Sequence, residues 1–483
     1  MVSNNLIMQF LKRFLFLILT LSIFYACSKN ESTSNPIPQN SAKEVTIFHI
    51  NDQHGKLDNF SKIKYIIDQE KELTNVMVVC GGDIFSGNPV VDNYNEKGFP
   101  MIDLMNKVGF DIATIGNHEF DYGEAILKDR FQQSNFEWIC ANVNMNATGI
   151  PEPSEYKTIT KNNVKVTFLG LVETNGKENA IIPSTHPWRV QNLTFQKYNT
   201  LITNYAQIKE VENSDLYIAL THLGEYTDKN IATNYPYFDL IIGGHSHSIT
   251  NTTVNNIPIF QAGSNLNYLG KIKLTIKNKN IESLTYDLID LTTYSNYDST
   301  LKSIIDTYNE DANLDEVIGY ANAYHSTSQV GYFYTDALRN EMNVDLTFQN
   351  SGGIRASLNE GAILKREIYT IDPFNNGSVT YTMTVSEIKN FLKNSGAGFY
   401  YSGGTIEQQG NDIVIKNDNQ EILSDNFNLT IGLNDYIPAV YDTYFTQTPT
   451  FLPFTTAEAI INYLNNNSSP INYTNYNNYF KFQ

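Results

Sequence analysis

The chain has 483 residues, which is too long for one ordinary hydrophobic core and predicts two or three domains. Hydrophobic residues make up 41% of it and charged residues 17%, a balance typical of globular proteins and not of disordered ones. The formal net charge of −18 at pH 7 argues against non-specific binding of nucleic acid, which needs clustered Lys and Arg. We therefore expect a multidomain globular protein without a nucleic-acid partner.

The first 26 residues have the pattern of a signal peptide. A basic pair precedes the apolar run Phe14 to Ala26, which is too short for a comfortable membrane span. Cys27 follows a small residue and resembles the lipidated Cys of bacterial lipoproteins. We therefore expect a signal peptide over residues 1–26, a flexible tether over 27–43, and an exported protein anchored to a membrane by a lipid on Cys27, facing the periplasm or the cell surface. The alternative is plain secretion or an uncleaved anchor, with Cys27 incidental.

Patterns of buried strands recur from residue 44 onward, with helix-like stretches between them. Several of the apolar runs lack the alternation of half-exposed strands, as strands buried on both faces do. The stretches 61–72 and 99–108 are long enough for helical crossovers. We therefore expect a layered α/β domain over residues 44–295. Its strands are predicted at Val45–Ile50, Val76–Cys80, Asp111–Ile115, Val164–Val172, Leu216–Leu220, Phe238–Ile242, Ile257–Gln261, Lys271–Ile276 and Ile281–Leu291.

A polar stretch separates this domain from a second, smaller one. We expect a linker over residues 296–320, with a helix around Leu301–Tyr308. Residues 321–483 open with a helical pattern at Val330–Met342 and an apolar strand at Asp345–Phe348.

Side chains of the metal-ligand type follow five of the predicted strands. Ligands of open α/β sheets gather beyond the carboxyl ends of the strands, so we expect the five loops to converge on one crevice. The residues are Asp52 and His54, then Asp83, then Asn117, His118 and Asp121, then His222, and finally His245 and His247.

The spacing and chemistry of these residues indicate a metal centre. Asp52 and His54, like His245 and His247, are two residues apart, and we expect an extended backbone to present both members of each pair at one metal centre. Carboxylate and imidazole ligands suit divalent ions such as Mn, Zn, Fe or Co. These motifs contain no Cys, so they do not indicate a structural zinc site.

Each fragment alone is weak, because a lone His beside a strand is more often structural. However, five of the eight histidines lie in these motifs. The other three, His49, His186 and His325, are expected to be structural.

The five motifs, in this order, resemble those of the calcineurin-like metallophosphoesterases over residues 44 to about 290. The resemblance implies a four-layer α/β sandwich and a centre for two divalent ions, with Asp83 bridging them. It also implies a catalytic dyad in which Asp121 orients His118. One ion would be held by Asp52, His54, Asp83 and His247, and the other by Asp83, Asn117, His222 and His245.

Two motifs of the second half, at residues 350–355 and 372–376, extend the resemblance to the 5′-nucleotidase family, up to about residue 450. This implies an α+β substrate-binding domain in which Arg355 contacts the phosphate or ribose side of a nucleotide.

The same resemblance assigns a binding site for the nucleoside. Phe399 and Tyr436 would sandwich the base, and Asp442 would bond the ribose hydroxyls. The chain departs from the family here, with Tyr at 436 where Phe is usual and without the glycines that usually flank the Asp. The alternative is that both aromatics only pack.

We expect a metal-dependent phosphate-ester hydrolase, namely a 5′-nucleotidase that releases phosphate from nucleoside 5′-monophosphates. The alternatives are a nucleotide-sugar or 2′,3′-cyclic nucleotide hydrolase of the same superfamily, and a non-catalytic surface lipoprotein that binds nucleotides. The enzyme is favoured because a pure binder need not keep both His118 and Asp121.

Replacing the predicted lipid attachment site tests the anchor. Cys27→Ser should move the protein from the membrane fraction to the soluble extracytoplasmic fraction, because no other residue is expected to carry the lipid. Fractionation and immunoblotting measure this, with Ser32→Ala in the same tether as the control. A Cys27→Ser variant that stays with the membrane contradicts lipidation.

Overall fold

The computed structural model of the protein describes residues 42–146, 148–310 and 312–483. The predicted signal peptide, Cys27 and all but the last two residues of the predicted tether lie outside the described residues. Within those described ranges, no helix is both long and apolar enough to pass through a lipid bilayer.

The first lobe is built on two six-stranded sheets, with strand orders β14-β13-β1-β2-β3-β4 and β11-β12-β10-β9-β7-β6. Strands β1 to β4 run parallel in the first sheet, as do β7, β9, β10 and β12 in the second. The first sheet comprises β1 (Lys43–Ile50), β2 (Val76–Cys80), β3 (Ile112–Thr114), β4 (Glu137–Ile139), β13 (Tyr268–Lys277) and β14 (Asn280–Asp290). The second comprises β6 (Tyr156–Lys161), β7 (Val164–Val172), β9 (Leu216–His222), β10 (Leu240–Ile242), β11 (Ile249–Val254) and β12 (Ile257–Ala262).

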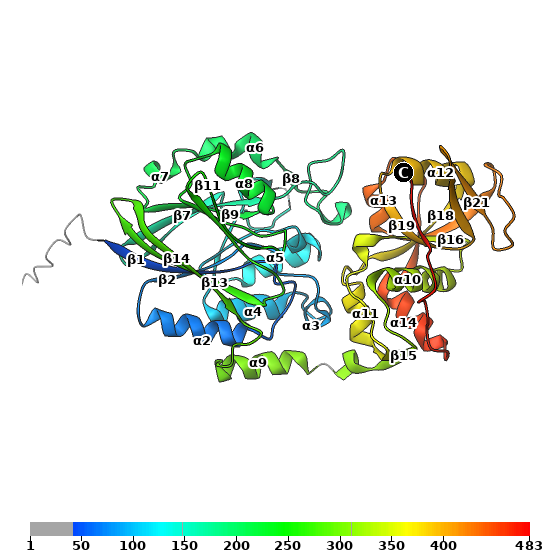
Figure 1. Ribbon diagram of the computed structural model, residues 1–483, viewed down its shortest axis with the longest axis horizontal. Coiled ribbons are helices and arrows are strands. Elements are labelled where there is room, and N and C mark those ends of the chain that lie inside the picture. The colour runs from blue at the N-terminus through cyan, green and yellow to red at the C-terminus, as the bar shows by residue number, and fades with distance from the viewer. Residues whose placement is uncertain (1–41, 147, 311) are drawn as a thin grey trace, which may run out of the picture. The chain divides into compact units, whose positions relative to one another are not determined.

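Helices cover the outer face of each sheet, with α2, α4 and α9 on one side of the lobe and α6, α7 and α8 on the other (Figure 1). A short ladder of β5 (Val143–Asn144) and β8 (Thr194–Phe195) lies apart from both sheets. The α-helices of this lobe are α2 (Phe60–Lys71), α3 (Pro89–Asp92), α4 (Phe99–Val108), α5 (Glu124–Gln133), α6 (Tyr198–Leu201), α7 (Ile208–Val211), α8 (Glu225–Asn234) and α9 (Ser299–Asn309).

Three apolar layers hold these elements together and confirm the predicted four-layer sandwich. In β1, Phe48 and Ile50 pack toward the helices, whereas Val45 and Ile47 pack against the second sheet. A third cluster joins the second sheet to its own helices. Both faces of the central strands are therefore buried, which explains why their sequences are apolar without alternation.

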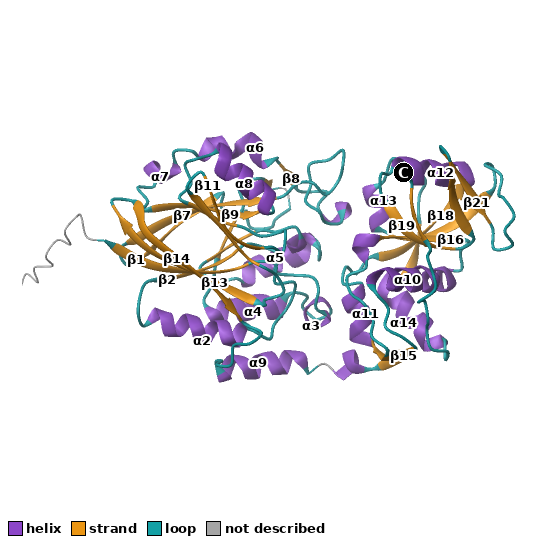
Figure 2. Ribbon diagram, viewed as in Figure 1, coloured by secondary structure: helices purple, strands orange, loops and turns teal. Residues whose placement is uncertain are grey.

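The second lobe has one mixed sheet of order β23-β18-β22-β16-β19-β24, with helices on both faces (Figure 2), as the predicted α+β domain requires. Its strands are β16 (Leu346–Asn350), β18 (Gly377–Thr384), β19 (Gly398–Ser402), β22 (Asn428–Asn434), β23 (Thr450–Thr455) and β24 (Tyr479–Lys481). Two further two-stranded antiparallel ladders pair β15 (Val317–Ala321) with β17 (Gly361–Leu364) and β20 (Thr405–Gln409) with β21 (Asp412–Lys416). The helices are α10 (Thr327–Met342), α11 (Lys365–Ile371), α12 (Val385–Asn394), α13 (Tyr436–Val440) and α14 (Thr456–Asn466).

The segment expected to be a linker, residues 296–320, is largely built into the two lobes. Leu301 and Ile305 of α9 are buried in the core of the first lobe, and β15 already pairs within the second. The helix expected around Leu301–Tyr308 is α9, and an apolar stripe buries one side of it against the first lobe.

Helix α10 begins three residues before its predicted start. Ser326 accepts a hydrogen bond from the backbone N–H of Gln329, and the Gln329 side chain bonds back to the backbone N–H of Ser326. This capping box satisfies donors at the start of the helix and fixes its first turn.

A histidine inside the first lobe should make folding sensitive to acid. His49 is fully buried in β1, its ring stacks on Tyr286, and neither ring nitrogen has a hydrogen-bond partner among the described residues. Burial lowers the pKa of His49 from 6.5 to about 3. Below pH 6.5 the His49 ring is therefore protonated in the unfolded chain but stays neutral in the folded chain. Because the unfolded state binds this extra proton, His49 lowers the free energy of unfolding as pH falls toward 3.

Replacing this ring should remove that sensitivity. The stability of His49→Leu relative to the unsubstituted protein should rise as pH falls from about 7 to about 5, by up to ~1.4 kcal/mol per pH unit. Denaturant unfolding at both pH values measures the free energy of unfolding. Parallel pH profiles for the two proteins would show that His49 is not the source.

Candidate metal centre and active site

The ends of β1 and β2 bring the first predicted ligands together. The last residues of the two strands pair with each other, and the loops beyond them stay joined through their backbones. The N–H of Asp52 donates to the carbonyl of Gly82 at 2.9 Å, and the N–H of His54 donates to that of Asp83 at 3.1 Å. The strand register therefore places three of the predicted ligands side by side.

One group of possible ligands consists of Asp52, His54, Asp83 and His247, whose ligand atoms all lie within 4.8 Å of one another. The Nε2 atoms of His54 and His247 are 2.9 Å apart, and Nε2 of His247 is 3.4 Å from a carboxylate oxygen of Asp52. This set matches the first ion of the predicted centre.

A second group consists of Asp83, His222 and His245. Nε2 of His222 lies 3.0 Å from Asp83 Oδ2, and the side-chain oxygen of Asn117 lies 3.2 Å from His222 Nε2 and 3.0 Å from His245 Nδ1. Asp83 belongs to both groups, so its carboxylate lies where a bridging ligand is needed.

The histidine rings are oriented as metal ligands require. Nδ1 of His54 donates to the carbonyl of Ser86 at 3.0 Å, and Nδ1 of His222 donates to that of Gly81 at 2.7 Å, which directs Nε2 of each ring into the centre. Burial lowers the pKa of His222, but the carboxylates of Asp83 and Asp52 outweigh it and raise the pKa to about 10. A divalent cation can replace that proton because it neutralises the same carboxylates, so the donor set fits divalent metals.

The expected extended backbone is wrong for both ligand pairs. Asp52, His54, His245 and His247 have φ angles of 52°, 48°, 80° and 55°, all in the left-handed region. His245 and His247 fall into different ligand groups, which agrees with the division between two ions that the family resemblance implies. Tight turns, and not an extended strand, orient these side chains. The left-handed backbone of these non-glycine residues costs conformational energy, as is common at functional sites.

Glu119 supports the bridging carboxylate and was not predicted. This buried side chain accepts hydrogen bonds from the backbone N–H groups of Asp83 at 3.0 Å, Ile84 at 2.6 Å and Gly116 at 2.5 Å. A Cβ at Gly116 would collide with Asp83 Oδ1, so only glycine fits there. The position of Glu119 within the run Asn117 to Asp121 is the only sequence signal for it.

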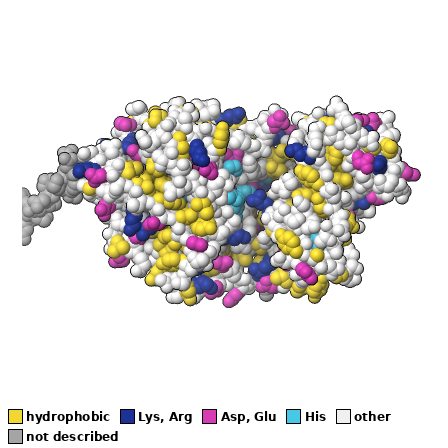
Figure 3. Space-filling view, in the orientation of Figure 1, with side chains coloured by type: hydrophobic (Ala, Val, Ile, Leu, Met, Phe, Trp, Pro, Cys, Tyr) yellow, Lys and Arg dark blue, Asp and Glu magenta, His cyan; other side chains and the backbone are white. Residues whose placement is uncertain are grey.

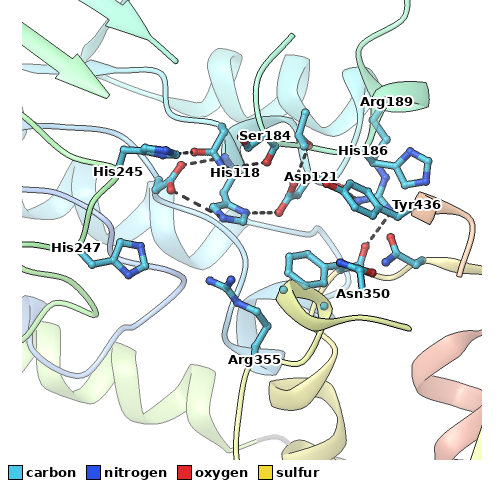
Figure 4. Close-up of a pocket in the computed structure, with 17 residues that line it drawn as sticks. His118, Asp121, Ser184, His186, Arg189, His245, His247, Asn350, Arg355 and Tyr436 are labelled. Carbon is cyan, nitrogen blue, oxygen red and sulfur yellow. Dashed lines mark hydrogen bonds and ion pairs between the residues drawn. The ribbon is translucent and has the colours of Figure 1, made fainter. Parts of the chain in front are cut away.

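His118 and Asp121, which were expected to form a dyad, lie within hydrogen-bonding distance of each other. Nδ1 of His118 is 2.6 Å from Asp121 Oδ2, while Thr185 Oγ1 donates to Asp121 Oδ1 at 2.8 Å (Figure 4). Burial disfavours the charged imidazole, but the charges of Asp121 and Asp83 outweigh it and raise the pKa of His118 to about 9. The ring is thus held by one nitrogen, with a positive charge available at the other.

The dyad and four of the candidate ligands line a cavity of about 330 Å³ to which the second lobe also contributes. These four ligands are Asp83, Asn117, His245 and His247. Figure 3 shows His side chains together with Lys and Arg side chains at a hollow on this face. Arg355 and Tyr436, two of the predicted substrate residues, line it, and the Arg355 guanidinium lies 5.7 Å from the centre of the Phe374 ring. The second lobe lines the cavity with Asn350, Gly352, Gly353, Arg355, Phe374, Asn376 and Tyr436.

The other two predicted substrate residues lie elsewhere. Phe399 is 0% exposed in the core of the second lobe, with its ring against Phe391 and Tyr441, so it offers no face to a base. The expected base sandwich is corrected at this residue, where the packing alternative applies. Asp442 forms a 2.7 Å ion pair with Lys177 and lines a separate cavity of about 460 Å³.

The cavity also holds two residues that the sequence did not reveal. His186, expected to be structural, lines it and lies 3.0 Å from Asp435 of the second lobe. Arg189 lines it as well. Neither belongs to a recognisable motif, and their roles depend on contacts with residues far along the chain.

Known proteins resemble this chain in sequence and in fold. The chain is 26% identical over 425 residues to Endonuclease YhcR of Bacillus subtilis, covering 76% of this chain and 34% of that protein, so it spans about a third of that relative. It is 25% identical over 425 residues to a 5′-nucleotidase of Vibrio vulnificus, covering 72% of this chain and 75% of that protein. The crystal structure of a 5′-nucleotidase precursor from Thermus thermophilus has the same fold, with a TM-score of 0.76 at 19% identity over 88% of this chain and 96% of that one.

Two family models match successive parts of the chain. The model described as calcineurin-like phosphoesterase matches residues 45–248, which contain all the predicted metal ligands. The model described as 5′-nucleotidase, C-terminal domain, matches residues 309–438, which contain Arg355 and Tyr436. With these two domains in this order, the chain belongs to the 5′-nucleotidase family of calcineurin-like metallophosphoesterases.

Proposed function

We propose that the protein is a metal-dependent phosphohydrolase that releases phosphate from nucleoside 5′-monophosphates. One observation carries this proposal: Asp83, shared by two groups of metal ligands, lines the same cavity as Arg355 and Tyr436. A ligand in that cavity can meet the metal centre at one end and the second lobe at the other.

The two ligand groups that share Asp83 suit two divalent ions, with Mn, Zn, Fe or Co as the candidates. Such a pair supplies an activated water and neutralises charge on the attacking and leaving oxygens of an in-line displacement at phosphorus. The carboxylates and imidazoles of the chain hold this centre, and Glu119 fixes the loop that carries Asp83.

His118 is the group that meets the phosphoryl oxygens in this proposal. Asp121 holds Nδ1 of the ring, so Nε2 carries its proton on the side of the centre, 4.0 Å from an oxygen of Asp83. A proton at Nε2 can stabilise negative charge that develops on the phosphoryl group or pass to the leaving oxygen.

Arg355 and Tyr436 are the residues that we expect to bind the phosphate and the base of the nucleotide. The guanidinium of Arg355 suits an anionic phosphate, and the ring of Tyr436 offers a face on which any base can stack. Phe374, the other aromatic of the cavity, lies against His118 and Arg355. The similarity to the Vibrio 5′-nucleotidase supports nucleotides as the substrate class.

The proposal also includes export and a lipid anchor on Cys27, which the sequence pattern of residues 1–27 supports.

Phosphate release from nucleoside monophosphates, nucleotide sugars, cyclic nucleotides and p-nitrophenyl phosphate, with added Mn, Zn or Mg, tests the function. We expect metal-dependent release with preference for nucleoside 5′-monophosphates. His118→Ala should lower kcat by about 100- to 10,000-fold while the protein keeps its metals, because the ring is not a ligand. Absence of release from every substrate contradicts the enzyme, and equal rates on nucleotides and p-nitrophenyl phosphate contradict the role of Tyr436.

Comparing Asp83→Ala with His118→Ala should distinguish a residue that binds metal from one that only takes part in the chemistry. Both ligand groups contain Asp83, so the variant should lose both ions together with all activity. Inductively coupled plasma mass spectrometry after dialysis measures the bound metal, with His118→Ala as the metal-retaining control. An Asp83→Ala protein that keeps both ions would show that the carboxylate does not bridge them.

A further inference from the structure

A short segment of the first lobe touches both the catalytic dyad and the second lobe. Residues 184–189, here called the bridging segment, lie between β7 and β8 and include a single turn of 3₁₀ helix at Pro187–Arg189. Four of its side chains line the active-site cavity, namely Ser184, Thr185, His186 and Arg189. Figure 4 shows the segment beside the dyad and opposite Asn350 and Tyr436.

Toward the first lobe, the bridging segment holds Asp121 and a metal-ligand candidate. Thr185 Oγ1 donates to the carboxylate of Asp121 at 2.8 Å, and the Arg189 guanidinium donates through Nη1 to the backbone carbonyl of Asp121. The side-chain amide of Asn117 donates to the carbonyl of Ser184 at 3.0 Å. Asp121 is thus fixed through both its side chain and its backbone.

Toward the second lobe, the same guanidinium binds the loop that carries Phe374. Nη2 of Arg189 donates to the backbone carbonyls of Phe374 at 2.8 Å and Asn375 at 3.2 Å. His186 adds a bond from Nε2 to Asp435 at 3.0 Å, because its Nδ1 accepts the N–H of Trp188. One planar group therefore joins the carbonyls of Asp121 and Phe374, which lie far apart in the chain.

An Arg side chain can bind the carbonyls of Asp121 and Phe374 at the same time, and a Lys side chain cannot. A guanidinium presents five N–H donors in a rigid planar fork, so it can serve carbonyls on two sides at once. An ammonium is a point charge on a flexible stem and cannot hold Asp121 and the Phe374 loop at a fixed spacing.

We propose that Arg189 is a positioning residue that ties the orientation of Asp121, and through it His118, to the docking of residues 372–376. This inference rests on the proposed function, because it concerns the dyad of that reaction. It has a specific consequence: the second lobe contributes to turnover even of a substrate too small to use its nucleoside-binding surface. Arg189 then acts on the chemical step and not on nucleotide affinity.

Kinetics on two substrates separates these roles. Arg189→Lys and Arg189→Gln should both lower kcat by about 10- to 100-fold on adenosine 5′-monophosphate and equally on p-nitrophenyl phosphate, with KM and metal content nearly unchanged, because misplacing a catalytic group by about an ångström costs this much. Arg339→Gln is the matched control, since Arg339 pairs with Asp418 inside the second lobe and does not line the cavity. A rise in KM for the nucleotide alone, or an unchanged kcat, overturns the proposal.

Hydrogen–deuterium exchange tests the same tie without any turnover. Arg189→Gln should lose backbone protection both at residues 118–123 and at 372–376, whereas Arg339→Gln should lose it at neither. Unchanged protection at both segments, or a change confined to one of them, overturns the proposal. If the unsubstituted protein releases no phosphate from any substrate, the proposed function fails, and the exchange measurement still decides whether Arg189 links the two segments.

Discussion

The carboxylate of Asp83 is the group on which the rest of the site depends. It is buried, and a buried carboxylate is stable only when cations and hydrogen-bond donors surround it. His222 lies 3.0 Å away, the N–H of His118 donates to it at 2.9 Å, and Glu119 holds the backbone of its loop. The parallel strands that end level with one another place all of these groups around one point.

The second lobe lines the cavity opposite the candidate metal ligands. The candidate metal ligands and the His118–Asp121 pair come entirely from the first lobe, whereas Arg355, Phe374 and Tyr436, which line the same cavity, come from the second. Hydrogen bonds from the bridging segment join the two sets directly at the cavity. In the proposed function, reaction class and substrate class are therefore set by different lobes, and Arg189 contacts residues of both.

The sequence predicted which candidate ligands lie together, because the signal for them is local. Each follows an apolar strand, and the strand register alone brings Asp52 and Asp83 together. Phe399 was placed wrongly because a motif cannot reveal whether neighbouring rings cover a side chain, and here Phe391 and Tyr441 do so. Glu119, His186 and Arg189 bond to loops elsewhere in the fold, so only three-dimensional structure identifies their roles.

Anomalous X-ray diffraction from crystals of the Mn-loaded protein tests the central claim most directly. The shared position of Asp83 predicts two anomalous peaks about 3.5–4 Å apart, one on each side of its carboxylate. One peak should lie among Asp52, His54 and His247, and the other among Asn117, His222 and His245. A single peak, or two peaks of which only one touches Asp83, would contradict the account.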